Sequence, residues 1–119
     1  MVGNGIGNTM PHCIIEHSSN LDPFALNELV FTAAHESKLF AEDGKDIKVR
    51  SQPYDYYFVG GEKVDFIHVS IRLLAGRSAD QKRMLSLHTQ SKLKRLNLER
   101  ASITVEVIDM DSQSYVKEG

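Results

Sequence analysis

Pro11 is the residue of this sequence with the most distinctive chemical potential, because it directly follows Met10. If translation begins at Met10, removal of that methionine is expected, since proline is a small second residue, and Pro11 then carries a terminal secondary amine. Burial among apolar neighbours lowers the pKa of such an amine toward neutrality. A neutral amine is a competent general base at pH 7, so the pair points to proton transfer. The alternative is a proline at the start of an edge strand, where no backbone donor is needed.

A second candidate site lies at Ala75-Gly76-Arg77-Ser78, between a predicted strand and a predicted helix. The N–H groups of a helix N-terminus point outward, so Arg77 and its neighbours are one candidate for an anion-binding nest. Many strand-to-helix turns carry a glycine, so the spacing alone also fits an ordinary connection.

The histidines and the cysteine do not form a recognisable metal motif. The five histidines show no i,i+4 pair and no HExxH arrangement, and Cys13 is the single cysteine. A zinc site needs three or four converging ligands. We therefore expect no metal, and one cysteine without a disulfide is typical of a reducing cytoplasm.

Charge and hydropathy exclude two further classes of partner. The 119 residues carry 14 Lys and Arg against 16 Asp and Glu, a formal net charge of -2, so no overall field favours nucleic acid or an anionic membrane. The basic run Lys92–Arg100 alternates with leucines, which is typical of a solvated helix face. No apolar run approaches the roughly 20 residues that span a bilayer.

Hydrophobic periodicity predicts the elements that must position these candidates. Asp22 before Pro23 signals the start of one helix, and Ser78 with Gln81 forms a capping box for a second. Alternation is clearest in the strand that contains Ile67, where aliphatic residues at every second position face one way and His68, Ser70 and Arg72 face the other. The predicted strands are His12–Glu16, Ile47–Arg50, Tyr54–Val59, Phe66–Leu74 and Ile103–Val107, and the predicted helices are Pro23–Phe40 and Ala79–Leu96.

The chain divides into a short leader and one domain. Residues 1–10 are rich in glycine and asparagine and are predicted to be a flexible leader. Residues 11–119 form two strand–helix halves of similar length, and their last residues, from Asp109 on, read as a polar tail.

Three short motifs in this order resemble a known family. They are PHCIIE beginning at Pro11, IKVRS around Arg50 and AGRS around Arg77, and they are similar to the 5-carboxymethyl-2-hydroxymuconate Δ-isomerases of the tautomerase superfamily. The resemblance extends from Pro11 to about Val107. It implies an α+β fold of β-α-β-β-α-β order, with a mixed four-stranded sheet, two helices on one face and a homotrimeric assembly.

The resemblance also implies a reaction without metal or organic cofactor, and roles for three residues. Pro11 matches the proline that moves the proton, and Arg50 and Arg77 match arginines that hold the carboxylates of a small unsaturated acid from aromatic compound degradation. Arginine suits this role because its planar fork binds carboxylates with two hydrogen bonds. The expected activity is therefore an isomerase or tautomerase that depends on a free Pro11 amine.

The leader leaves a second function open. While residues 1–10 are attached, the nitrogen of Pro11 is an amide that accepts no proton, so a non-catalytic trimeric binding protein of the same fold is the alternative. If Pro11 is not the base, His12 and Glu16 are the remaining candidates. We also expect the sheet face away from the helices to be apolar and to be covered in the homotrimer.

Overall fold

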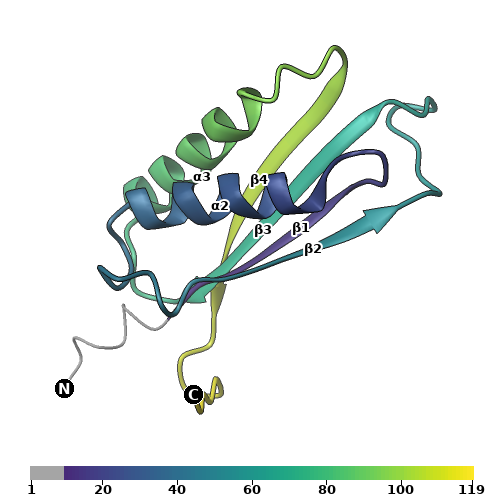
Figure 1. The fold of residues 1–119 in the computed structure, drawn as a ribbon. Coiled ribbons are helices and arrows are strands. Elements are labelled where there is room, and N and C mark those ends of the chain that lie inside the picture. The colour runs from purple at the N-terminus through teal and green to yellow at the C-terminus, as the bar shows by residue number, and fades with distance from the viewer. Residues whose placement is uncertain (1–9) are drawn as a thin grey trace.

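The computed structural model describes residues 10–119, so the predicted leader lies outside the described residues except for Met10. Figure 1 shows the six elements in the order strand, helix, strand, strand, helix, strand. Their bounds are β1 His12–Ser18, α2 Pro23–Glu36, β2 Lys48–Tyr54, β3 Asp65–Leu74, α3 Ala79–Lys94 and β4 Ala101–Met110.

The four strands form one mixed sheet in the order β2-β1-β3-β4. β1 pairs with β2 in parallel, β3 pairs with β4 in parallel, and β1 pairs with β3 antiparallel. Each parallel pair is joined through a helix, and both helices lie on the same face of the sheet (Figure 1). The predicted α+β fold with two β-α-β halves is therefore confirmed.

Both helix starts form as the sequence predicts. The side chain of Asp22 accepts a hydrogen bond from the backbone N–H of Phe24, and Pro23 takes the first helical position. Ser78 and Gln81 form a reciprocal capping box at α3. Such caps stabilise a helix because they satisfy N–H groups that have no partner within it.

The helix-facing side of the sheet forms the core. The buried aliphatic residues of β3 alternate with its polar ones, as predicted, and α2 and α3 close over them. The fully buried residues on this side include Cys13, Ile15, Ile67, Val69, Ile71, Leu73, Leu26, Val30, Leu85 and Leu93. Met10, just before β1, is also fully buried in this cluster.

The opposite face, which we call the open face, is polar rather than apolar. His68 and Ser70 of β3 lie on it and hydrogen-bond across to Glu106 of β4, and Arg72 is exposed. The expectation of a bare apolar face was therefore wrong, because His68, Ser70 and Arg72 alternate with the buried residues of β3, and His68 and Ser70 hydrogen-bond to β4. Because this face is polar, it gives no argument for a trimer from the burial of apolar surface.

Two predicted boundaries also differ from the structure. The predicted strand Ile47–Arg50 continues through Pro53 as β2, which ends at Tyr54. The predicted strand Tyr54–Val59 was wrong, because beyond Tyr54 it forms only an isolated bridge, at Val59. Because β2 is at the edge of the sheet, a residue without a backbone N–H is tolerated there. The first helix ends at Glu36 rather than Phe40, since Ser37 caps it and Lys38 turns to a φ of 61°.

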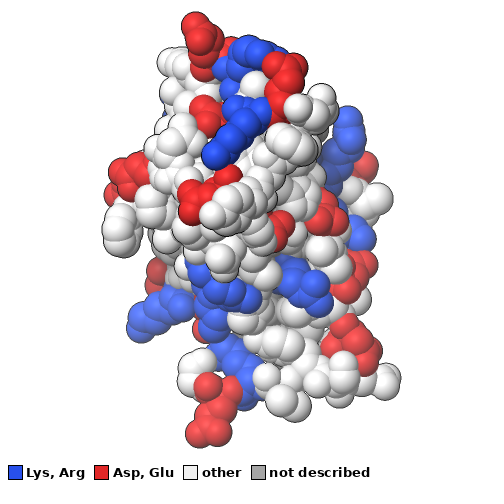
Figure 2. Space-filling view, turned by 90° about the vertical axis from the view of Figure 1, so that its right-hand side faces the viewer, with Lys and Arg blue, Asp and Glu red and all other residues white. Residues whose placement is uncertain are grey.

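The described surface carries both signs of charge. On the face drawn in Figure 2, Lys and Arg side chains are interspersed with Asp and Glu and do not form one continuous basic surface. Among residues 10–119, no helix is long and apolar enough to cross a membrane.

Candidate functional site

Pro11 lies at the start of β1, immediately after the buried Met10, and is itself buried. Its carbonyl oxygen accepts a hydrogen bond from the backbone N–H of Lys48 at 3.0 Å, which fixes it beside the first residue of β2. In the chain that includes Met10, the nitrogen of Pro11 is an amide nitrogen. Pro11 is therefore buried and held in place, but a base exists there only when Pro11 is the first residue.

The sheet topology brings the predicted site residues to one end. β1 and β2 both start at this end, and β3 runs toward it because it is antiparallel to β1. The β3 strand is followed directly by the turn that carries Arg77, and the N–H of Ala75 in that turn bonds the carbonyl of Met110 at 3.3 Å. Pro11, Arg50 and Arg77 thus lie at the same end of the sheet.

The two arginines have different surroundings. Arg50 is exposed on the open face, where its Nη1 donates to Nδ1 of His12 at 3.1 Å. Arg77 is half-buried, donates from Nη2 to the carbonyl of Leu39, and stacks over the ring of Phe40 with 5.2 Å from Cζ to the centroid. Burial lowers the pKa of Arg77 from its ordinary value, although a guanidinium stays protonated at neutral pH. A half-buried cation attracts an anion more strongly than an exposed one, because water screens it less.

The turn around Arg77 offers fewer free donors than the predicted nest requires. The N–H of Ser78 donates to the side chain of Gln81 at 2.9 Å, and Ser78 Oγ accepts from the N–H of Gln81 at 3.1 Å. Gly76 adopts a φ of 134°, which an L side chain rarely takes, so glycine is needed at this turn. Two of the backbone donors that the predicted nest relies on, those of Ser78 and Gln81, are therefore already engaged within the capping box.

His12 has a more specific environment than its position in the sequence suggests. Its Nε2 lies 3.0 Å from the hydroxyl of Tyr115, and its Nδ1 accepts from Arg50. Burial and then the charges of Arg50, Lys48 and Arg72 hold the pKa of His12 below its usual range. The polar tail supplies Tyr115 to this end of the sheet, and no pattern in the sequence indicated that contact.

The other proposed base, Glu16, is already engaged. Its Oε2 accepts a hydrogen bond from the hydroxyl of Tyr54 at 2.7 Å, and this bond raises the pKa of Tyr54.

Cys13 is buried, and burial raises the pKa of its thiol to about 12, so it stays protonated and inert at neutral pH. Within residues 10–119, no group of three or more His, Cys, Asp or Glu is placed to hold a metal ion.

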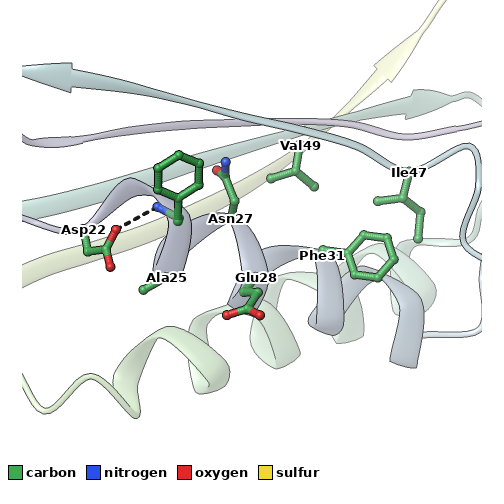
Figure 3. Close-up of a pocket in the computed structure, with 8 residues that line it drawn as sticks. Asp22, Ala25, Asn27, Glu28, Phe31, Ile47 and Val49 are labelled. Carbon is green, nitrogen blue, oxygen red and sulfur yellow. Dashed lines mark hydrogen bonds between the residues drawn. The ribbon is translucent and has the colours of Figure 1, made fainter.

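A groove on the described surface lies elsewhere. It has a volume of about 620 Å³ and runs between α2 and β2, where Figure 3 shows Phe31 and Ile47 at one end and Asp22 near the other. Its charged lining residues, Asp22 and Glu28, are both acidic. Because these carboxylates repel an anion, the groove does not suit a polycarboxylate, and the site residues predicted from the sequence do not line it.

Two β-α-β halves in one mixed sheet, with a proline at the start of the first strand, define a domain of the tautomerase type. The chain belongs to the 5-carboxymethyl-2-hydroxymuconate isomerase family, whose model matches residues 11–118. This membership places the chain among isomerases of the tautomerase superfamily. No curated protein sequence matches the chain.

Solved structures agree with the assignment of the fold. A 5-carboxymethyl-2-hydroxymuconate delta-isomerase is similar with a TM-score of 0.76 and 20% identity, over 95% of this chain and 91% of the other. A 5-carboxymethyl-2-hydroxymuconate isomerase from Deinococcus radiodurans R1 has a TM-score of 0.74 and 19% identity, over 95% and 92%. A fused 4-OT symmetric trimer has a TM-score of 0.74 and 18% identity, over 89% and 90%.

Proposed function

We propose that this protein is an isomerase that moves a double bond in an unsaturated oxo- or hydroxy-polycarboxylic acid, similar to 5-carboxymethyl-2-hydroxymuconate, through the amine of Pro11. The observation that supports the proposal is that Pro11, Arg50 and Arg77 lie at the same end of the sheet in a member of this family. Pro11 moves the proton in its amine form. The reaction needs no metal and no organic cofactor, since an amine and two guanidinium groups suffice.

The arginines supply binding and transition-state stabilisation. Arg50 and Arg77 hold the substrate carboxylates through charged hydrogen bonds, which are stronger than neutral ones. A cation near the Pro11 amine also disfavours its protonated form, which keeps the base neutral. Stabilisation of the developing enolate by fixed positive groups provides a large share of the rate.

The proposal also includes the oligomeric state and the cellular location of the protein. A homotrimer is supported by the structural similarity to a protein that is itself a symmetric trimer. Light scattering of the purified protein is expected to give about three times the 13.4 kDa chain mass, and a monodisperse monomer would contradict a trimer. A cytoplasmic role in the degradation of aromatic compounds agrees with the single cysteine and with the family.

A non-catalytic binding protein of the same fold is the second candidate, and one observation favours it. Met10 is fully buried in the core, so the peptide bond before Pro11 is held by packing. Removal of Met10 costs the stability that its buried side chain contributes. The intact mass of protein isolated from its native host discriminates the two: loss of residues 1–10 favours the enzyme, and their retention favours the binding protein.

A substrate-class assay tests the isomerase directly. Protein that begins at Pro11 is given a 2-hydroxydienoic acid with three carboxylates and an analogue with one, and conversion to the ketone is followed by absorbance. We expect turnover of the tricarboxylate and a much lower kcat/KM for the monocarboxylate, because both arginines need an anionic partner. Equal kcat/KM for the two compounds would contradict the roles of the arginines, and no turnover of either would contradict the isomerase.

A further inference from the structure

A cluster of positive side chains surrounds His12 on the open face. Lys48 of β2 and Arg72 of β3 are the residues that pair with His12 on its two neighbouring strands, so all three side chains project to the same face. Arg50, two positions further along β2, bonds Nδ1 of His12 at 3.1 Å. The charges of Lys48, Arg50 and Arg72 all act on His12.

The neighbouring carboxylates leave this cluster positive. Glu106 of β4 acts on Arg72, but its Oε2 already accepts hydrogen bonds from His68 at 2.7 Å and from Ser70 at 3.2 Å. Asp46, just before β2, pairs with Lys117 of the tail at 3.4 Å. Three cations therefore share the surface around His12 with two nearby acids, Glu106 and Asp46, which are both bonded elsewhere.

The hydrogen bonds of His12 define its protonation state. A guanidinium only donates, so Nδ1 must accept from Arg50, and His12 is therefore neutral in this arrangement. Its proton lies on Nε2, which donates to the hydroxyl oxygen of Tyr115 at 3.0 Å. The three cations disfavour protonation of the neutral imidazole. An anion that binds beside them offsets their charge and therefore favours the imidazolium.

We propose that Lys48, Arg50 and Arg72 form a polycarboxylate-binding site around His12 on the open face, and that protonation of His12 tightens this binding. The inference rests on the proposed function: it adds Lys48 and Arg72 to the residues that hold the substrate, and it makes binding depend on pH. The sign follows from linkage. An anion beside His12 favours the imidazolium, so bound anion raises the pKa of His12, and anion affinity in turn increases as the pH falls from 7.5 to 5.5.

Citrate binding to the full chain tests the site without any catalysis. The imidazole resonances of His12 are followed by NMR during titration with citrate, succinate and acetate at constant ionic strength. We expect citrate to bind most tightly, the pKa of His12 to rise with bound citrate, and Arg72→Gln or Lys48→Gln to weaken binding about five- to tenfold. Arg100→Gln is the matched control, because Arg100 is exposed and pairs with Glu62 at 3.3 Å away from the cluster.

Two histidine variants test the pH dependence. His12→Gln is expected to abolish the increase in citrate affinity as the pH falls from 7.5 to 5.5, whereas His68→Gln, on the same face, retains the increase. Unmoved His12 resonances on titration, or an equal loss of affinity in Arg100→Gln and Arg72→Gln, would overturn the site. An unchanged pH dependence in His12→Gln would overturn the role of His12.

The two proposals fail in distinguishable ways. If citrate binds as expected but protein beginning at Pro11 turns over no 2-hydroxydienoic acid, the isomerase is wrong and the anion site stands. If turnover is observed and Arg72→Gln changes neither citrate affinity nor KM, the isomerase stands and this site is wrong.

Discussion

Ile67, Val69 and Ile71 of β3 point toward α2 and α3 and are fully buried, whereas His68 and Ser70 point the other way and are hydrogen-bonded to β4. The same strand therefore contributes to the packed core on one face and to a polar, hydrogen-bonded surface on the other. On the buried face, close packing makes each lost methyl group costly. On the open face, charges and hydrogen bonds are exchangeable with water, so a substitution there affects binding more than folding.

A pair of adjacent substitutions on β3 separates the two faces most strongly. Ile71→Ala removes a fully buried side chain and is expected to lower the free energy of unfolding by about 2–5 kcal/mol. Ser70→Ala, on the open face, removes one hydrogen bond to Glu106 and is expected to cost less than about 1 kcal/mol. Urea unfolding of both variants measures the difference, and equal losses would contradict the division between faces.

The arginines extend the comparison to activity. In protein that begins at Pro11, Arg77→Ala is expected to lower kcat/KM roughly 30- to 1000-fold, because a half-buried cation is lost. This corresponds to a loss of about 2–4 kcal/mol of transition-state stabilisation. Arg50→Lys keeps the charge at an exposed position and is expected to cost less. Steady-state kinetics with a tricarboxylic dienol checks both values. Full activity in Arg77→Ala would remove Arg77 from the substrate site.

The smallest expected effect is on the pH dependence of the free energy of unfolding. The hydrogen bond from His68 lowers the pKa of Glu106 below its ordinary 4.5, so this pair stabilises the fold above that pH and the contribution is lost as the pH falls below it. The effect is expected to be less than about 1 kcal/mol, because solvent screens a pair whose carboxylate side chain is 51% exposed. Unfolding in urea at pH 7 and pH 3.5 measures it, and His68→Gln is expected to reduce the difference between the two pH values.

The buried face was predictable from the sequence because its signals are local. Alternation in β3 and the caps at Asp22 and Ser78 depend on residues a few positions apart, and all three were confirmed. The continuity of β2 through Pro53 was not predicted, since proline is excluded from strands except at an edge, and only the sheet order identifies the edge.

The candidate site was predictable only in part, because its contacts are long-range. The three motifs placed Pro11, Arg50 and Arg77 in order along the chain, but the bond between His12 and Tyr115 joins residues 103 positions apart. Tyr115 lies in a tail whose composition is polar and without periodicity, so no local pattern marks it. The cluster of Lys48 and Arg72 around His12 likewise depends on the strand register.

The role of Pro11 as the base is the central claim, and the chain terminus tests it most directly. The kcat/KM for a 2-hydroxydienoic tricarboxylate is measured for the full chain and for protein that begins at Pro11, with intact mass confirming both termini and circular dichroism confirming that both are folded. We expect the full chain to have little or no activity, because an amide nitrogen accepts no proton. The protein that begins at Pro11 is expected to be active, with a rate that rises as the pH passes the lowered pKa of its terminal amine. Comparable specific activity in the two forms would contradict the claim and leave His12 or Glu16 as the base.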